Sequence, residues 1–346
     1  MKAINDTACK LQHFKEIDFL KGIAITLVIL GHSIVSTPIN LHNTHWCDMV
    51  SLWCGSAQMP LFFLVSGFCF SYRGDYKAFA LKKAKRLLIP CLFFNLIDMI
   101  PRAALSELMG KPSGIHESIR STIFAGGSYW FLHTLMVIFL IFPCISFVYQ
   151  KYKIAKFLFL PILIIINLYN FSSISIFRDI LCIKSVGGYL VYFYIGYICK
   201  QNFSILKKVK QLMLQHKVSI IGLDVIILIA WFLLCQVKFS SILLGVSIRM
   251  VNSFLGILFF TIAVSILELP HISKAFIEFG KYSLQLYLLN RFYIFACKTI
   301  SFSVFGITSP LLIIVINMSA ALVLSYFSIK YIFNRFKLFR VVSGAN

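Results

Sequence analysis

The side chains best placed for chemistry lie in the first long apolar segment of this sequence. Asp18, Lys21 and His32 are the ionisable residues of the segment IDFLKGIAITLVILGHS, which covers residues 17–33. Lys21 and His32 are eleven positions apart, close to three helical turns, so we expect both on one helix face, about 16 Å apart along the axis. Asp18 precedes Lys21 by three positions and can pair with it on that face.

A histidine in such a helix is suited to general base catalysis. A neutral imidazole can accept the proton of a hydroxyl group while that hydroxyl attacks a carbonyl carbon. Ionisable side chains inside membrane helices are costly and are therefore candidates for function. The alternative is structural, because a lone histidine also serves in packing or in a hydrogen bond between helices. The segment by itself allows both roles for His32.

The elements that position these residues are predicted to be transmembrane helices. Of the 346 residues, 59% are hydrophobic and 13% are charged, whereas a soluble domain keeps much of its exposed surface polar. Apolar runs of roughly 17–25 residues can cross about 30 Å of hydrocarbon as helices, which satisfy their backbone groups internally. We therefore expect an all-α, polytopic integral membrane protein with a single domain. Its ten predicted spans cover residues 17–36, 50–72, 87–106, 129–149, 157–174, 186–199, 218–236, 248–267, 282–300 and 308–330.

The charge distribution predicts the orientation of these helices. The formal net charge is +21, which in a soluble protein would indicate a nucleic-acid partner. Here most basic residues fall in alternate connections, as the positive-inside rule requires, so we expect no nucleic-acid partner. This pattern places both chain ends in the cytoplasm, with a short basic tail at residues 334–346. The longest external connection, residues 107–128, contains glycine and proline and is predicted to be a loop.

The ten cysteines do not indicate a metal or redox site. They are spread along the chain, and neither a Cys-x-x-Cys pair nor a Cys/His spacing typical of zinc sites occurs in the sequence. A free cysteine in an apolar segment behaves as a small hydrophobic residue. We therefore expect no metal cofactor.

Five segments, in order along the chain, resemble the membrane acyltransferase 3 family. The first is the helix with Lys21 and His32, because the family has a basic residue, ten intervening positions and a histidine there. The others are MPLFFLVSGF at 59–68, KKAKRLLIP at 82–90, YWFLHTL at 129–135 and GKYSLQLYLLN at 280–290. Two positions depart from the family pattern. Lys21 replaces an arginine and loses its planar fork, and Asn290 replaces a histidine, which we infer to be secondary to His32.

The resemblance implies an enzyme of the bacterial inner (cytoplasmic) membrane. Members of this family transfer an acyl group, usually acetyl, from cytoplasmic acyl-CoA to a hydroxyl of a cell-surface or lipid-linked saccharide. The resemblance therefore implies acetyl-CoA as donor and a glycan acceptor. It also implies one domain over residues 1–346 with its core at about 14–333. Succinyl in place of acetyl, and a covalent acyl-enzyme in place of direct transfer, stay open as alternatives.

Three sets of residues are expected to form the site. The predicted catalytic set consists of His32, Lys21, Ser33 and Asn290. Cations suit the phosphates of the donor, and the predicted donor-binding set consists of Lys21, Arg73, Lys82, Lys83, Lys85 and Arg86. The predicted substrate-binding set consists of Ser66, Tyr129, Trp130, His133, Ser283 and Tyr287. The alternatives are topology for the loop cations and helix packing for His133.

Two other functions fit part of this pattern. A secondary transporter or flippase for a saccharide or small solute would also have about ten helices and a polar interior. It has no evident need for the basic cluster together with Lys21 and His32, and no internal repeat is visible in the sequence. A non-catalytic relative of the family is suggested by Asn290 alone. We therefore expect an O-acyltransferase, most simply an O-acetyltransferase.

Overall fold

The computed structural model describes residues 15–36, 40–41, 44–108, 115–152, 154–171, 182–237, 241–266 and 270–344. All regular structure within these ranges is helical, which confirms the all-α prediction. Each predicted span overlaps a helix. These helices are α1 (Lys15–Val35), α2 (His45–Phe68), α4 (Ile89–Leu108), α6 (Trp130–Lys151), α7 (Ala155–Phe171), α8 (Ile183–Gln201), α10 (Lys217–Gln236), α11 (Ile242–Ile266), α13 (Ser283–Ser303) and α14 (Pro310–Ser328).

Among the described residues, six helical segments are long and apolar enough to cross a membrane. They are Lys15–Val35, His45–Phe68, Ser118–Lys151, Lys217–Gln236, Ile242–Ile266 and Pro310–Phe333, and a further apolar helix, Ala155–Tyr169, is shorter. α13 is less apolar because it carries Gln285, Arg291 and Lys298. Outward-facing side chains are often apolar, such as Val218 on α10, which is 85% exposed. The fold is that of an integral membrane protein, and the number of ten spans stays a prediction.

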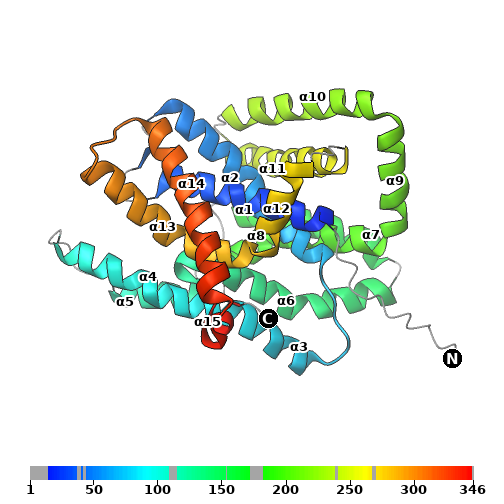
Figure 1. The fold of residues 1–346 in the computed structure, drawn as a ribbon. Coiled ribbons are helices and arrows are strands. Elements are labelled where there is room, and N and C mark those ends of the chain that lie inside the picture. The colour runs from blue at the N-terminus through cyan, green and yellow to red at the C-terminus, as the bar shows by residue number, and fades with distance from the viewer. Residues whose placement is uncertain are drawn as a thin grey trace.

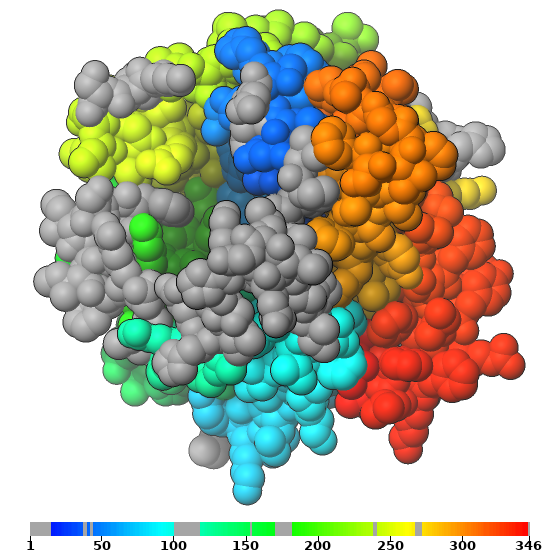
Figure 2. All heavy atoms as spheres, turned by 90° about the vertical axis from the view of Figure 1, so that its left-hand side faces the viewer, coloured from blue at the N-terminus to red at the C-terminus, as the bar shows by residue number. Residues whose placement is uncertain are grey.

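The helices pack around α1. Figure 1 shows a group of helices with roughly aligned axes, α1, α6, α8, α10 and α11. α9 (Phe203–Gln215) lies across the right-hand end of this group. α1 packs against α2, α13, α14 and α12 (Pro270–Lys281), so the helix that carries Lys21 and His32 lies inside the bundle. Figure 2 shows the molecule from the left-hand side of Figure 1. The beginning of α2, α13 and part of α4 are exposed on this face.

Two glycines bring the backbones of α1 and α12 into contact. A Cβ atom at Gly22 would lie 1.9 Å from the carbonyl oxygen of Phe276, and one at Gly280 would lie 1.8 Å from that of Asp18. Only glycine permits this approach, which is common between membrane helices. The contact matters for the site because it carries Lys281, at the end of α12, next to α1. α12 is short and lies in a predicted cytoplasmic connection, so hydropathy does not reveal it.

The connection predicted to be an external loop is partly helical. Its second half forms α5 (Ile115–Ala125) and the 3-10 turn η3 (Gly127–Tyr129). Gly126 and Gly127 have φ angles of 73° and 54°, so these glycines end the helix rather than indicate a loop. The loop prediction was wrong for these residues.

The predicted basic tail is also folded onto the bundle. α15 (Lys337–Val342) packs against α4. The Nε2 atom of Gln285 on α13 donates hydrogen bonds to Asn334 Oδ1 and to Ser343 Oγ, each at 3.1 Å. The sequence does not show this packing, because the Gln285 side chain that holds the segment lies about fifty positions earlier in the chain.

Candidate active site

Two cavities share Tyr287 as a lining residue. The first, called here the basic cavity, has a volume of about 210 Å³ and is lined by four cations, Lys21, Lys83, Arg86 and Lys281. The second, called here the hydroxyl cavity, has a volume of about 590 Å³ and holds His32. Besides Tyr287, its wall carries four hydroxyl side chains, Ser118, Ser121, Thr122 and Ser128. Eight of the predicted site residues thus line two cavities that share one tyrosine.

The cations of the basic cavity come from different helices. Lys21 of α1 bonds to Asp18 Oδ1 at 3.3 Å, as predicted, and Lys281 of α12 bonds to Glu278 Oε2 at 3.0 Å. Lys83 ends α3 (Tyr76–Lys83), and its ammonium lies 3.6 Å from the centroid of the Phe139 ring. These groups form a positively charged cavity with an aromatic wall, which suits an anionic ligand that also has apolar parts.

Only part of the predicted donor-binding set reaches this cavity. Lys83 and Arg86 line it, whereas Lys82, Lys85 and Arg73 are exposed outside it. Lys83 and Arg86 are three positions apart, at the junction of α3 with the π-helical turn η2 (Ala84–Leu88), and so share a face. The prediction was therefore wrong for the placement of the other three cations.

Burial changes the protonation of Lys83, which precedes the predicted span at residues 87–106. Removal from water lowers its pKa to about 8, and the positive charges of Arg86 and Lys82 add to this effect. Of the residues predicted to bind the substrate, Ser66 and Ser283 line the basic cavity together with the cations, and Tyr287 lines both cavities.

In the hydroxyl cavity, Asn290 determines how His32 is hydrogen-bonded. Asn290 Nδ2 donates to the carbonyl oxygens of Leu286 (2.9 Å) and Tyr287 (2.7 Å), so both of its amide hydrogens are used. Its Oδ1 atom lies 2.9 Å from His32 Nδ1 and can only accept, so Nδ1 carries the hydrogen. In the neutral ring Nε2 then keeps its lone pair, and among the described residues none bonds to it. His32 is held in the tautomer that a general base at Nε2 requires.

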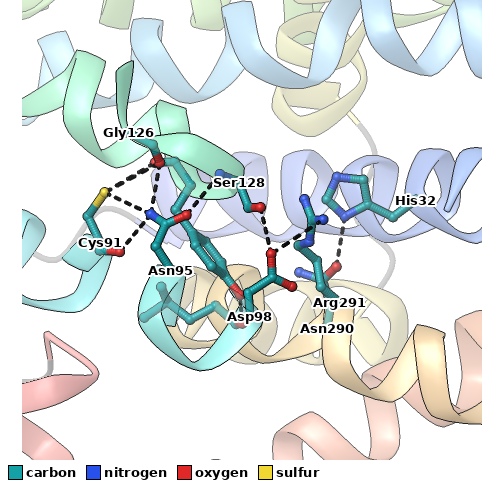
Figure 3. A network of polar contacts seen from close by, with 10 residues as sticks. His32, Cys91, Asn95, Asp98, Gly126, Ser128, Asn290 and Arg291 are labelled. Atoms are coloured by element: carbon teal, nitrogen blue, oxygen red, sulfur yellow. Dashed lines mark hydrogen bonds and ion pairs between the residues drawn. The ribbon is translucent and has the colours of Figure 1, made fainter. Parts of the chain in front are cut away.

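A polar network lies beside this pair (Figure 3). Ser128 Oγ donates to Asp98 Oδ2 at 2.6 Å, and Arg291 Nη2 lies 3.9 Å from the same oxygen. Asn95 on α4 accepts from the backbone N–H of Ser128 at 2.9 Å and donates to the Gly126 carbonyl at 2.9 Å. The sequence offered one signal for this network, the intramembrane carboxylate Asp98, which the family segments do not include.

Besides Asn290 and the three exposed cations, three more predicted site residues line neither cavity. Ser33 Oγ donates to the carbonyl oxygen of Ile29 at 2.8 Å, within its own helix. Tyr129 is buried, and its hydroxyl donates to the carbonyl oxygen of Leu288 at 3.0 Å. His133 Nδ1 lies 3.1 Å from Cys182 Sγ. The roles predicted for Ser33, Tyr129 and His133 stay predictions that the two cavities do not support, whereas Trp130 lines the hydroxyl cavity.

A buried lysine that sequence patterns did not single out caps the helix of His32. Lys298 on α13 is fully buried, and its ammonium donates to the carbonyl oxygens of Ser33 (3.0 Å), Ile34 (3.3 Å) and Ser36 (2.8 Å). The last carbonyls of a helix have no partners within the helix, and a cation there also favours the helix dipole. Lys298 therefore caps the end of α1, which lies three residues after His32.

Comparison with known proteins gives the family. A family model described as an acyltransferase domain matches residues 14–330. Nodulation protein NolL of Sinorhizobium fredii (strain NBRC 101917 / NGR234) is 32% identical over 128 residues, which are 36% of this chain and 34% of that protein. Nodulation protein NolL of Mesorhizobium japonicum (strain LMG 29417 / CECT 9101 / MAFF 303099) is 29% identical over 128 residues, with the same coverage.

The matched segment thus spans about a third of the length of these relatives. No solved structure matches the chain. The family match, in contrast, runs from the first described helix to the last long one and covers most of the sequence. This protein therefore belongs to the acyltransferase 3 family.

Proposed function

We propose that this protein transfers an acyl group, acetyl in the simplest case, from acyl-CoA to a hydroxyl of a cell-surface or lipid-linked saccharide. Acyl transfer follows from the family, and the donor and acceptor are what we add. One observation carries the proposal. His32, oriented by Asn290, lies in a cavity that shares Tyr287 with a second cavity lined by four cations.

The basic cavity is the proposed donor site. The phosphates of coenzyme A are anionic, and Lys83, Arg86, Lys21 and Lys281 can form charge-assisted hydrogen bonds with them. Lysine and arginine concentrate in cytoplasmic connections, and acyl-CoA is a cytoplasmic metabolite, so we place this cavity and both chain ends on the cytoplasmic side of a bacterial inner membrane. The thioester would extend from the basic cavity toward Tyr287.

The reaction is proposed to use His32 as general base. The acceptor hydroxyl oxygen attacks the thioester carbonyl carbon while His32 Nε2 takes the hydroxyl proton. The carbon–sulfur bond then breaks, and the sulfur of coenzyme A leaves with the proton returned by His32, so that an ester and a thiol are formed. Asn290 accepts from Nδ1 throughout and keeps the ring in place. Tyr287, which lines both cavities, is the proposed donor to the oxyanion.

The test is a His32→Ala substitution in the full-length protein. Surface polysaccharides and lipid-linked sugars are analysed by mass spectrometry, with and without the protein. We expect the variant to lose acylation by at least about a hundredfold, the range for a lost general base, while it accumulates normally in membranes. His45→Ala is the matched control, because His45 is exposed at the start of α2 and lines neither cavity. Wild-type acylation in His32→Ala would overturn the proposal.

A saccharide transporter or flippase is a second candidate, favoured by the same meeting of two cavities at Tyr287. Such a protein would move its solute without acetyl-CoA. It would also tolerate Lys83→Ala and Arg86→Ala, which remove cations from the basic cavity. Uptake of lipid-linked sugar into proteoliposomes, with and without acetyl-CoA, separates the two functions.

A further inference from the structure

We propose that the hydroxyl cavity is a binding site for a neutral sugar, in which Asp98 and Arg291 bond the sugar hydroxyls and Trp130 supplies an apolar wall. The inference rests on the proposed function, because it names the acceptor class for the same reaction. Four observations support it: the spacing of the Asp98–Arg291 pair, the rigidity of the elements behind it, the lining of the cavity and its charge.

Asp98 and Arg291 form an ion pair that is too long for a direct hydrogen bond. Arg291 Nη2 and Asp98 Oδ2 are 3.9 Å apart, longer than a hydrogen bond, and the side chains are 27% and 15% exposed. A hydroxyl both donates and accepts, so one sugar hydroxyl can donate to the carboxylate and accept from the guanidinium. Figure 3 shows the Arg291 guanidinium between the Asp98 carboxylate and the His32 ring. A sugar bound by this pair therefore lies next to the proposed base.

The residues that position Asp98 are held by buried hydrogen bonds. Asn95 is 2% exposed, and it bonds the backbone N–H of Ser128 and the carbonyls of Gly126 and Cys91. A Cβ atom at Gly127 would lie 2.5 Å from Asn95 Oδ1, so the turn and the amide are in close contact. This arrangement holds Ser128 Oγ on Asp98 Oδ2. The carboxylate is thus oriented before any ligand binds, which lowers the entropic cost of recognition.

The rest of the lining suits a polyol with an apolar face. Ser118, Ser121 and Thr122 of α5 add hydroxyls to the wall. Trp130 lines the cavity, and its ring packs against Tyr189 with centroids 5.6 Å apart, so the indole is held in place. A sugar ring presents hydroxyls at its rim and C–H groups on its face, and a site with few convergent polar groups and an aromatic wall matches both.

The charges of the described lining residues favour a neutral ligand. Among the described residues of this wall, Asp98 and Arg291 carry opposite charges and lie together. A sugar carboxylate or phosphate could reach Arg291 only beside the Asp98 carboxylate, and like charges at this distance repel each other. The hydroxyl cavity differs in this respect from the basic cavity, where four cations are available.

The test has two arms, both with the full-length protein. In the first, mass spectrometry identifies the sugar residue that carries the acyl group in cells with the wild-type protein. A neutral sugar is expected, and a residue that bears a carboxylate or phosphate would overturn the inference. If no saccharide is acylated at all, it is the proposed function that fails.

In the second arm, Asp98→Asn and Arg291→Gln are compared with the wild type. We expect each to lower saccharide acylation at least tenfold, while binding of acetyl-CoA to the purified protein stays within twofold. Retained acetyl-CoA binding also shows that the variants are folded. Asp224→Asn is the control, since Asp224 on α10 is a buried carboxylate that lines neither cavity. Acylation within twofold of wild type in both variants would refute the inference, even if His32→Ala is inactive.

Discussion

The two cavities that meet at Tyr287 are built in opposite ways. In the basic cavity, Lys21 and Lys281 are long side chains, 29% and 44% exposed, and each pairs with an acid one turn earlier in its own helix. Asn95, which lines the hydroxyl cavity, is 2% exposed, and Asn290, which lies behind His32, is 0% exposed; both bond backbone groups. The basic cavity is lined by lysines that can change position, whereas the residues of the hydroxyl cavity are held in place by buried amide side chains.

This difference matches the proposed tasks of the two cavities, which are donor binding in the basic cavity and proton transfer in the hydroxyl cavity. Exposed ion pairs contribute little to stability, so the cations can change partner when an anionic ligand arrives. A buried amide that loses a partner leaves an unsatisfied group, at a cost of about 1–3 kcal/mol, and so stays in one orientation. Binding of phosphates tolerates movement, whereas proton transfer depends on the position and tautomer of a single ring. We therefore expect substitutions to affect donor affinity on one side and turnover on the other.

The largest expected effect, apart from the loss of His32, concerns Asn290. Asn290→Ala removes the acceptor for His32 Nδ1, so the ring is free to rotate and to exchange tautomers. We expect kcat to fall by about tenfold to a hundredfold, the range seen when the group that orients a functional histidine is removed. The KM for acetyl-CoA should stay within twofold, because Asn290 does not line the basic cavity.

Asn290→Asp is the matched variant. A carboxylate oxygen can still accept from Nδ1, although it cannot donate to the carbonyls of Leu286 and Tyr287. It should retain more activity than Asn290→Ala. Equal losses in the two variants would show that Asn290 only packs against the ring.

The next effect concerns the basic cavity. Lys83→Ala and Arg86→Ala should each raise the KM for acetyl-CoA about tenfold, as expected for one lost bond to a phosphate. Lys82→Ala and Lys85→Ala remove the same charge from exposed positions of the same segment and should change KM less than twofold. If all four variants behave alike, the segment acts through its net charge and the cavity has no special role.

Lys298 allows a stability test of the helix end that supports His32. Lys298→Met leaves the carbonyl oxygens of Ser33, Ile34 and Ser36 without this donor. We expect a loss of about 1–3 kcal/mol in unfolding free energy, measured by thermal unfolding in detergent. Lys208→Met, at an exposed position of α9, is the control and should leave the melting temperature unchanged. A melting temperature unchanged in Lys298→Met would mean that water or the chain itself satisfies these carbonyls.

The sequence predicted the parts of the site that lie on one helix. Lys21 and His32 depend only on helical periodicity in α1, and Ser283, Tyr287 and Asn290 follow the same rule in α13. The ten hydrophobic runs were likewise visible, because lipid contact requires apolar surface over a whole helix. These features are local and need no knowledge of which helices are neighbours.

The errors arose where the direction of a side chain depends on neighbouring helices. Tyr129 and Trp130 are adjacent in one motif, yet only Trp130 lines a cavity. Asp98 and Ser128 were missed because their contact joins α4 to a turn thirty positions later. The inference that the family's histidine at position 290 is secondary concerned its chemistry, and no pattern within α13 could show that the amide of Asn290 would bond to His32.

The smallest effect distinguishes the two cavities by pH. Burial lowers the pKa of Lys83 to about 8, so its ammonium is charged at pH 7 and largely neutral at pH 9. Affinity for a non-hydrolysable acetyl-CoA analogue should therefore fall by a few-fold between these values, because the phosphates lose one cation. Lys83→Arg should abolish this dependence, since a guanidinium stays charged throughout the range.

The direction of proton exchange provides a second measurement of the same effect. A bound phosphate favours the charged form of Lys83, so binding of the analogue near pH 8 should take up protons. Calorimetry in buffers of different ionisation enthalpy measures this uptake, and Lys83→Arg should show less of it. Parallel pH curves for the two proteins would mean that Lys83 does not contact the donor, and donor binding would then depend on Arg86, Lys21 and Lys281. The hydroxyl cavity is not lined by Lys83 and should show no matching change in sugar affinity over this range.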